Sequence, residues 1–458
     1  MKTILYLFSF ILVFTSCNNT GQNRPKQDIL ISNISILDVA DGSILENRYV
    51  AIDSGRITSI SQKALDTTLF ETVIQGDGKF LMPGLAEMHA HIPPPESGEE
   101  RIKETLFLYL SNGITTIRGM LGNPIHLELR ENAANGSLLS PVIYTSSPSL
   151  NGNSVTTKEE AIEKVTQYQK DGYDFLKIHP GIQKEVFDQV VATAKEVGIP
   201  FSGHVPVDVG IRHALESQYA SIDHVDGFTE GLVPASANVE PNENGFFGYA
   251  FTPLADTTQI DDLVSLSKKN KVWIVPTQSL FERWFAPISA DELLSQPEMK
   301  YMNQSTLDNW RNTKNSYMED DSFTEAQWQQ FDAIRKKLIK KLQDNGQGIL
   351  LGSDAPQLFN VPGFSIQHEM AGMLRAGMTP MEIIQSGTIN PATFFNAENE
   401  YGQVKEGLSA DLILLNDNPI KDLAALQENE GVIVRGQYLS KEMIQEKLNE
   451  IAEHAAQN

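Results

Sequence analysis

The sequence predicts an α/β fold: a (β/α)8 TIM barrel joined to a small composite β-sandwich domain that both ends of the chain build together. Two observations lead to this fold class. Residues 81–398 alternate short apolar strands with amphipathic helices, which is the pattern of βα units around a parallel sheet. Residues 28–80 and 399–436 instead contain short segments in which apolar and polar residues alternate between turns, as in strands with one exposed face. Because these two segments flank the barrel, we expect them to form one domain.

The length and composition are those of an ordinary globular protein. The 458 residues are enough for one large domain and a smaller one. Hydrophobic residues make up 41% of the chain and charged residues 21%, which argues against a disordered or fibrous protein. The formal net charge of −23 offers no basic surface to neutralise phosphates, so we expect no nucleic-acid partner.

The first residues have the pattern of an export signal. Lys2 precedes an apolar run over residues 4–14, and two small residues then lead to Cys17, the only cysteine. A cysteine in this place resembles the lipobox of bacterial lipoproteins, whereas the alternative is an ordinary signal peptide with an incidental cysteine. We expect residues 1–17 to be a lipoprotein signal peptide and residues 18–27 to be a polar tether. The protein would then be exported and lipid-anchored to a bacterial membrane through Cys17, facing the periplasm.

Short alternating segments at both ends predict the strands of the β-sandwich domain, which we expect to be antiparallel. Turn dipeptides such as Asp41-Gly42 and Ser54-Gly55 separate these segments. The expected strands are residues 29–36, 49–52, 56–60 and 72–75 in the first part, and 402–404, 411–416 and 431–434 in the second part. Residues 437–458 are expected to form a C-terminal helix.

Eight apolar segments in the middle of the chain predict the barrel strands, and helical patterns separate them. The expected strands are residues 84–89, 114–118, 142–146, 175–179, 200–204, 221–224, 272–277 and 349–354. The expected helices are residues 99–111, 125–135, 158–170, 183–196, 207–216, 258–268, 325–344 and 366–375. Two stretches do not fit the repeat, residues 226–257 and 281–323. Because both follow barrel strands, we expect them to rise over the mouth of the barrel as lids or substrate walls, or else to be decorative insertions.

Candidate metal ligands fall in the expected strands, mostly at their C-terminal ends. His89 and His91 end the first strand and, two residues apart, share one face of it. The others are Lys177 in the fourth strand, His204 ending the fifth, His224 ending the sixth and Asp354 ending the eighth. Because the active site of a TIM barrel lies at the C-terminal ends of its strands, we expect these six side chains to point at one another.

This set of residue types favours a divalent metal site. Four histidines and one aspartate suit zinc or a similar ion. A lysine is unusual beside a metal, since an ammonium group repels cations. A buried amine loses its charge readily, however, and a neutral amine can add carbon dioxide to become a carbamate with two anionic oxygens.

The ordered set of His-x-His, Lys, His, His and Asp resembles the amidohydrolase superfamily of metal-dependent hydrolases. The similarity is to the group around imidazolonepropionase-like proteins and Xaa-Pro or Xaa-Arg dipeptidases. It extends to Pro83-Gly84-Leu85 before the first histidines, to Asn390-Pro391-Ala392, and to the closing residues 402–413. A composite β domain beside a barrel is also what that superfamily has.

The resemblance implies a role for each ligand. Lys177, carboxylated by carbon dioxide, would bridge two divalent ions, expected to be Zn²⁺. His89, His91 and Asp354 would hold one ion, and His204 and His224 the other. Two ions about 4 Å apart lower the pKa of a bridging water. Asp354 would take a proton from that water and pass it to the leaving amine. True imidazolonepropionases look mononuclear and lack this lysine, which disfavours their ring-opening reaction here.

Other residues near the predicted mouth have less certain roles. His179 shares a strand face with Lys177, so it could contact the substrate or support a ligand. Arg118 could pair with a substrate carboxylate or form a structural ion pair, and Gly119 stands where the resembling group has an acidic residue. Tyr173 and Trp284 could line a pocket, although packing is the commoner role of such aromatics. The remaining histidines fall in helical patterns or near the tail and are expected to be surface or core residues: His126, His213, His368 and His454.

The resulting functional prediction is hydrolysis of an amide-type C–N bond, in a dipeptide or an N-acyl amino acid, with Asp354 as general base and acid. One alternative keeps the site but acts on a cyclic amide, a lactone or an ester. A second alternative is a non-catalytic solute-binding lipoprotein, which would be expected to have lost ligands, and none is missing. The expected partners are a small-molecule substrate and the membrane at Cys17, and a homo-oligomer is compatible with the sequence.

Overall fold

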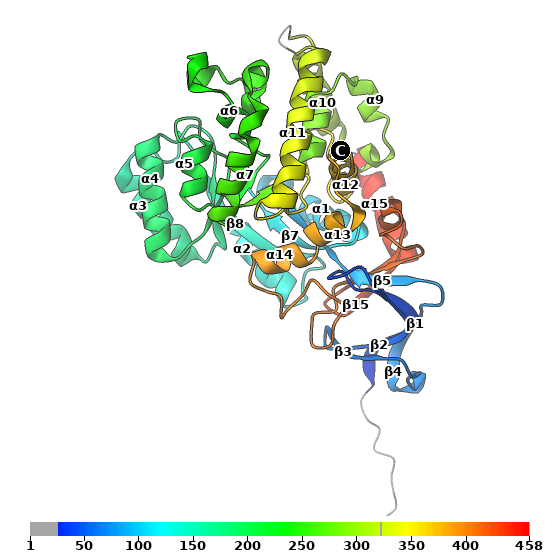
Figure 1. Cartoon of the computed structure of the whole chain (residues 1–458). Helices are drawn as coiled ribbons and strands as arrows, with labels where there is room; N and C mark the ends of the chain where they lie inside the picture. Colours follow the sequence, from blue (N-terminus) through cyan, green and yellow to red (C-terminus); the bar gives the residue numbers. More distant parts are fainter. Residues whose placement is uncertain (1–25, 321–322, 458) are drawn as a thin grey trace, which may run out of the picture.

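A computed structural model of the chain describes residues 26–320 and 323–457. The predicted signal peptide, the lipidation site Cys17 and most of the predicted tether lie outside the described residues. Figure 1 shows a helix-covered barrel and, beside it, a sheet that contains strands from both ends of the chain. The predicted fold class is confirmed in this arrangement.

The barrel wall contains a seven-stranded parallel sheet in which each strand pairs with its neighbours in sequence. The first seven predicted barrel strands occur in the predicted order, although several differ in length. They are β6 (Leu85–Ala90), β7 (Ile114–Gly119), β8 (Val142–Leu150), β9 (Phe175–Ile178), β10 (Phe201–Gly203), β11 (Ser221–Asp223) and β12 (Trp273–Val275).

The eighth predicted strand, residues 349–354, forms isolated bridges to its neighbours in place of a regular strand. Ile349 pairs with β12 and Ala355 pairs with β6, both in parallel orientation. The backbone N–H of Met88 in β6 also donates to the carbonyl oxygen of Leu351 at 2.8 Å. This segment therefore lies between the first and last strands of the sheet and closes the barrel.

Side-chain bonds hold the eighth segment where a regular ladder is missing. The carboxyl group of Glu87 in β6 accepts from the backbone N–H of Ser353 at 2.8 Å and from its hydroxyl at 2.7 Å. Burial raises the pKa of Glu87 to about 8. A Cβ on Gly352 would lie 2.8 Å from the backbone nitrogen of His89 and 2.6 Å from a methyl group of Val275, so only glycine permits this approach.

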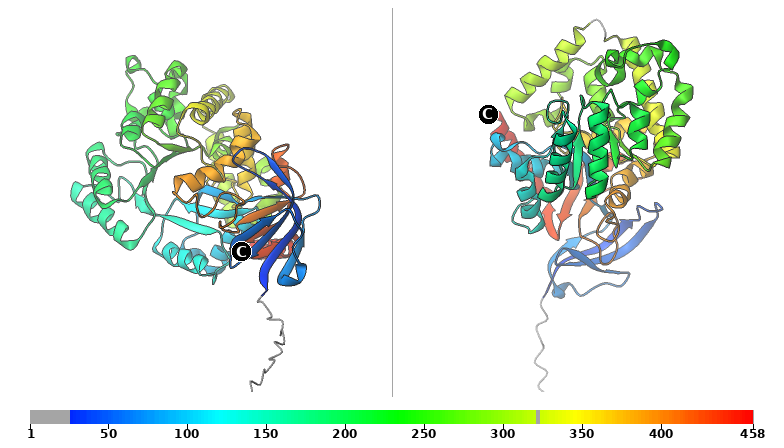
Figure 2. Two further views of the ribbon diagram at one scale, coloured as in Figure 1. Left: turned by 60° about the horizontal axis from the view of Figure 1, so that its bottom comes forward. Right: turned by 90° about the vertical axis from the view of Figure 1, so that its left-hand side faces the viewer.

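Helices follow the strands and cover the outside of the barrel (Figures 1 and 2). They are α1 (Glu99–Ser111), α2 (Pro124–Ala134), α3 (Lys158–Asp171), α4 (Lys184–Val197), α5 (Ile211–Glu216), α7 (Ile260–Lys269) and α11 (Glu325–Asn345). Local sequence sets their ends: Thr157 and Glu160 form a capping box at the start of α3, and Gly172 ends it in the left-handed region. Helix α5 begins four residues later than predicted, because residues 207–210 form a loop.

An eight-stranded mixed sheet forms the second domain. Its strand order is β15-β14-β13-β5-β1-β2-β3, with β4 also paired to β1. The strands are β1 (Gln27–Leu37), β2 (Ile44–Asp53), β3 (Arg56–Ser61), β4 (Phe70–Gln75), β5 (Phe80–Pro83), β13 (Leu412–Leu415), β14 (Asn429–Val434) and β15 (Gln437–Ser440). Figure 2 shows the blue and the orange to red strands, from opposite ends of the chain, side by side.

The structure corrects several details predicted for this domain. The sheet is not purely antiparallel, because β1 pairs in parallel with both β4 and β5. Residues 402–404 form no strand, whereas β5 and β15 were not predicted as strands of this sheet. Helix α15 (Lys441–Gln457) therefore starts after β15 and not at residue 437.

The sheet and the barrel share buried contacts where β5 leads into β6. The backbone N–H of Gly84 donates to the carbonyl oxygen of Asp411 at 2.8 Å. The side chain of Ile413 in β13 belongs to the hydrophobic core of the barrel, and a Cβ on Gly113 would lie 2.6 Å from its terminal methyl. The first strand of the barrel is therefore anchored to the mixed sheet.

The two stretches that interrupt the repeat contain short helices. Residues 226–257 hold α6 (Phe228–Gly231) and several 3-10 turns. The described residues of the second stretch include the end of α8 (Gln278–Phe285), α9 (Ala290–Leu294), a 3-10 helix over Pro297–Tyr301 and α10 (Gln304–Met318). The chain leaves the barrel through α12 (Ser365–Arg375), α13 (Pro380–Ser386) and α14 (Ile389–Phe394).

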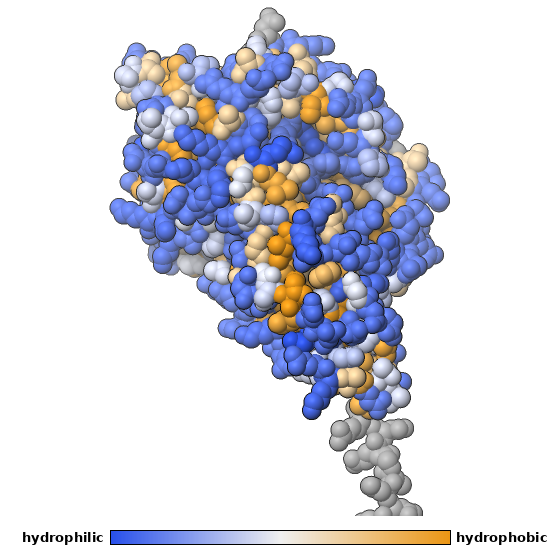
Figure 3. Space-filling model, turned by 45° about the vertical axis from the view of Figure 1, so that its right-hand side comes forward, coloured by the Kyte–Doolittle hydropathy of each residue, from blue (hydrophilic) through white to orange (hydrophobic). Residues whose placement is uncertain are grey.

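One face of the molecule is largely hydrophilic, with a narrow band of apolar side chains between polar regions (Figure 3). Across the described part of the chain, no helix has the length and apolarity needed to cross a membrane.

Candidate metal centre

The six predicted ligands line one cavity of about 580 Å³ at the C-terminal ends of the barrel strands. They come from five separate places in the barrel, which the parallel sheet brings together at one rim. The ligands are His89, His91, Lys177, His204, His224 and Asp354.

The tightest group combines the first strand with the eighth segment. Nε2 of His91 lies 2.7 Å from Oδ1 of Asp354, and Nε2 of His89 lies 3.5 Å from the same oxygen. One ligand atom from each of these three residues falls within 4.8 Å of the others, so the group could hold a metal ion. His89 and Asp354 are buried, whereas His91 is half-buried.

The imidazole rings continue from this group across the rim. The ring centroids of His89 and His224 are 4.6 Å apart, as are those of His224 and His204. The ring of His179 lies parallel to that of His204, with centroids 4.9 Å apart. The rings therefore form a continuous arc from the first strand to the fourth.

Three of the five histidines in the arc form a hydrogen bond through Nδ1 with an outer partner, which orients the ring. The distances are 2.6 Å for His179 to Ser149, 3.1 Å for His204 to Asp226 and 2.9 Å for His224 to Thr277. Such partners hold metal-binding histidines in one tautomer and orientation. In these three rings Nε2 is the nitrogen that remains available for a ligand. Nδ1 of His89 lies 3.2 Å from Asp223 without a hydrogen bond among the described residues.

Lys177 lines the same cavity, and its amine has no close partner among the described residues. Its side chain is fully buried, its Nζ has no hydrogen-bond partner among the described residues, and the nearest carboxylate oxygen, of Asp223, is 3.9 Å away. Burial lowers the pKa of the Lys177 amine. Gly203 provides room for it, since a Cβ there would lie 3.1 Å from Cδ of Lys177.

The electrostatics of the cavity favour neutral imidazoles. Burial lowers the pKa of His204 to about 3 and that of His179 to about 2. It also holds the pKa values of His89 and His224 well below their ordinary range. For Asp354, burial acts to raise the pKa, but His89 and His91 outweigh it and the pKa is lowered overall. A neutral imidazole and an ionised carboxylate are the forms that bind metals.

The backbone at the strand ends is strained. His224, Thr277 and Asp354 have φ values of 67°, 47° and 64°, in the left-handed region that residues other than glycine rarely adopt. Such conformations cost about 1–3 kcal/mol each and cluster at functional sites. Here two of the three residues, His224 and Asp354, are ligands that line the cavity, and Thr277 bonds to His224.

The structure separates the two residues proposed to contact substrate. His179 lines the cavity. Arg118 does not: it is fully buried and pairs with Asp223 at 2.9 Å, with further bonds to Ser221 and to the carbonyl oxygen of Met88. Arg118 therefore forms a structural ion pair, which is one of the two roles considered for it from the sequence.

Sequence reasoning overlooked the residues that support the ligands. Asp223 stands between Arg118 and His89 in a buried charge network, and Asp226 lies beside His204. Burial raises the pKa of Asp226 to about 7. The available signal was their place in the sequence, since Asp223 directly precedes His224 and Asp226 follows it by two residues.

The insertions roof the cavity with aromatic side chains. Phe246 and Phe247 come from residues 226–257, and Leu280 and Trp284 come from α8. The ring centroid of Phe247 lies 5.7 Å from that of His204 and 5.4 Å from that of His224. These segments therefore do rise over the mouth of the barrel.

The other aromatic and histidine residues considered from the sequence lie elsewhere. Tyr173 packs edge-to-face against Tyr168, with ring centroids 5.7 Å apart. The remaining described histidines do not line the cavity, and each lies beside a partner from its surroundings: His126 at the cap of α2, His213 at Asp188, His368 at Glu298 and His454 at Glu104.

Comparison with known proteins identifies the family. The sequence model described as "Amidohydrolase family" matches residues 80–239 and 304–439, which is more than half of the chain. Similar curated proteins include an adenine deaminase from Ruegeria sp. (strain TM1040), 26% identical over 92% of this chain, and an imidazolonepropionase from Alkaliphilus oremlandii (strain OhILAs), 24% identical over 86% of this chain. The chain spans 59% of the length of that adenine deaminase and 88% of that imidazolonepropionase.

Solved structures share the fold. A bottromycin amidohydrolase superimposes with a TM-score of 0.73 at 19% identity, covering 94% of this chain and 91% of the other. A Xaa-Pro dipeptidase with bound methionine superimposes with a TM-score of 0.63 at 20% identity, covering 90% and 99%.

Proposed function

We propose that this chain, which belongs to the amidohydrolase family, uses two divalent metal ions to hydrolyse an amide-type C–N bond in a dipeptide or an N-acyl amino acid. The proposal that two ions bind depends mainly on the surroundings of Lys177. A fully buried amine that has no hydrogen-bond partner among the described residues, in a cavity lined by histidines, is costly unless it is modified or bound.

The residues around the cavity fit such a pair of ions. His89, His91 and Asp354 would hold one ion, and His204 and His224 the other, with the carboxylated Lys177 between them. The fit rests on the cluster of ligand atoms within 4.8 Å and on the orphaned nitrogen of Lys177. Divalent ions, expected to be Zn²⁺, supply Lewis acidity when bound, which lowers the pKa of water and polarises a carbonyl group.

The remaining chemistry falls to the side chains of the chain itself. Asp354 is buried and ionised, and its carboxylate reaches toward both strand-one histidines, so it can accept a proton from the attacking water. The water oxygen bonds to the carbonyl carbon, the C–N bond breaks, and Asp354 returns the proton to the leaving nitrogen. The products are a carboxylic acid and an amine. His179, on the cavity wall, is placed to orient the substrate.

The matched relatives support chemistry at carbon–nitrogen bonds. The names of several matched proteins refer to such chemistry: an adenine deaminase, an imidazolonepropionase, a bottromycin amidohydrolase and a Xaa-Pro dipeptidase. A second candidate keeps the same site and acts on a cyclic amide, a lactone or an ester.

Metal analysis and turnover together test the proposal. Protein purified from zinc-supplemented medium should contain about two ions per chain, and it should release amines from a library of dipeptides and N-acyl amino acids. Chelation should abolish that activity and Zn²⁺ should restore it. A carbamate signal from ¹³C-labelled bicarbonate should appear in the metal-loaded protein. Full activity after complete removal of metal would contradict the proposal.

We further propose that the protein is exported and held at a membrane by a lipid on Cys17. The support is the sequence pattern before that cysteine. Cells fed a labelled fatty acid should incorporate the label into the protein, and Cys17→Ala should prevent this. Incorporation that persists in the variant would refute the anchor.

A further inference from the structure

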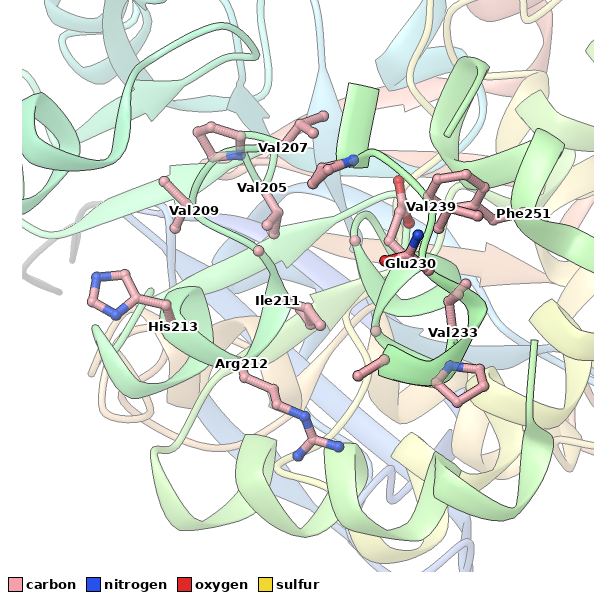
Figure 4. Close-up of a pocket in the computed structure, with 18 residues that line it drawn as sticks. Val205, Val207, Val209, Ile211, Arg212, His213, Glu230, Val233, Val239 and Phe251 are labelled. Carbon is pink, nitrogen blue, oxygen red and sulfur yellow. The ribbon is translucent and has the colours of Figure 1, made fainter. Parts of the chain in front are cut away.

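A second pocket of about 600 Å³ lies directly beside the metal cavity (Figure 4). Its walls come from the loop after β10, from α5 and from residues 227–251. The two spaces share three lining residues, Val205, Val207 and Glu230. A molecule that fills the metal cavity can therefore reach the second pocket by passing these three side chains.

The lining of this pocket combines a set of apolar side chains with a few polar ones. Figure 4 shows aliphatic side chains and the ring of Phe251, together with the imidazole of His213 and the guanidinium of Arg212. The apolar side chains are those of Val205, Val209, Ile211, Val233, Val239 and Phe251. Arg212 is exposed, and Nε2 of His213 already lies 2.6 Å from Asp188. Two apolar side chains beside the cavities stay exposed: Val207 at the junction is 36% exposed, and Leu121 on the metal cavity is 46% exposed. An apolar group bound here would remove these surfaces from water, which is the main source of affinity in pockets of this kind.

The polar groups at the junction do not favour an anion. Oε1 of Glu230 accepts a hydrogen bond from Asn244 at 2.8 Å, and its Oε2 is buried without a partner among the described residues. Burial raises the pKa of Glu230 to about 7, so the side chain carries less charge near neutral pH than an ordinary glutamate. Among the described residues that line the metal cavity, Lys177 is the only lysine or arginine, so a substrate carboxylate would meet no free cation there.

We propose that this pocket is a second subsite, in which the substrate of the metal centre places a large uncharged aliphatic group. The chain of that substrate would run past Val205, Val207 and Glu230 from the amide at the metal cavity. This rests on the proposed function, because that function puts the reacting amide at the metals. It narrows the substrate class to elongated amides with an apolar arm, in preference to small polar dipeptides.

Binding of matched ligands of increasing length tests the subsite. The ligands are sulfonamides, in which the sulfonamide group replaces the amide and resists hydrolysis. One series, the N-alkyl methanesulfonamides, carries the alkyl chain on nitrogen. The other, the N-methyl alkanesulfonamides, carries it on sulfur. Calorimetry on the zinc-loaded protein should show, in at least one series, about fourfold tighter binding for each methylene that enters the pocket. The corresponding amides, assayed for amine release, should show the same trend in KM.

A large side chain that fills the second pocket should remove the increase in affinity with chain length and leave the metal cavity unchanged. Val239 lines only the second pocket, so Val239→Trp should abolish the dependence on chain length and leave the shortest ligand unaffected. Ser236→Trp places the same ring on the same segment outside the lining residues and should behave as the unmodified protein does. Ala235→Trp, at an exposed position of the lining, is a second blocking variant should Val239→Trp fold poorly.

The outcomes separate this proposal from the function on which it rests. Binding that is independent of chain length in both series, or a gain that persists in the blocking variants, would overturn the subsite even if short amides are hydrolysed. A gain that the blocking variants remove supports the subsite, and hydrolysis of none of the amides in that case would count against the proposed function alone.

Discussion

The floor and the roof of the metal cavity are built in different ways. The floor is the arc of histidines with Lys177 and Asp354, carried by strand ends, buried, and held by specific partners such as Asp223 and Asp226. The roof is formed by Leu280 at the start of α8 and by Phe246, Phe247 and Trp284 from the insertions, and the ring of Phe246 contacts those of Phe247 and Trp284. Strand ends define positions closely, whereas inserted segments can vary without disturbing the barrel. The comparison indicates that the reaction depends on the floor and that substrate choice depends on the roof.

The sharpest test of the floor is Lys177→Ala. We expect turnover to fall below detection and bound metal to decrease, because the proposed bridge between the ions is lost. Metal analysis and amine release measure the two effects. Lys184→Ala, an exposed lysine on the following helix, should retain both. Full activity in Lys177→Ala would end the carbamate hypothesis.

Asp354→Asn should have the next largest effect. The amide cannot relay a proton, so turnover should fall by about 10²–10⁴-fold, the usual worth of general acid–base catalysis. Urea unfolding should change far less than turnover does. If the loss of activity merely matched a loss of folded protein, Asp354 would have only a structural role.

Asp226→Asn tests whether the residues that orient the metal-binding histidines affect metal affinity or activity. The side chain lies 3.1 Å from Nδ1 of His204, so its replacement should weaken metal affinity or activity by about 10–100-fold. A competition assay with a metal indicator measures the affinity. Asp208→Asn removes one carboxylate from an exposed position nearby and should have no effect. Equal behaviour of the two variants would show that His204 needs no such support.

Phe247→Ala should have the smallest effect of the four variants, and it should change substrate binding and not metal binding. Its ring lies over His204 and His224, so its loss should raise KM for an apolar amide about tenfold, or about 1.4 kcal/mol, and leave metal content unchanged. Phe323→Ala removes a ring that stacks on Tyr249 and does not line the cavity, and it should leave KM unchanged. A loss of metal in Phe247→Ala would show that the roof also supports metal binding, and would contradict the separate roles of floor and roof.

Much of the barrel could be predicted from local patterns. Residues 85–90 and 114–119 are short apolar runs bounded by turns, and the amphipathic period of residues 158–171 is clear. The eighth strand was harder to predict, because its apolar run resembles a strand whereas Ser353 bonds to the side chain of Glu87 in place of a regular strand ladder. Strands β5 and β15 were missed because each is only four residues long, and β5 gains its stability from pairing with β1 and β13, which are distant in sequence.

The sequence by itself determined the order of the βα units and the residue types at their strand ends, because side-chain period and turn chemistry are local properties. Only the tertiary structure decided that Arg118 belongs with Asp223 beneath His89, and that Phe247 covers the histidines. These contacts join residues about a hundred or more positions apart, or set the path of an insertion that has no repeating pattern. No local signal encodes them, since they depend on which buried charges and rings the closed barrel brings together.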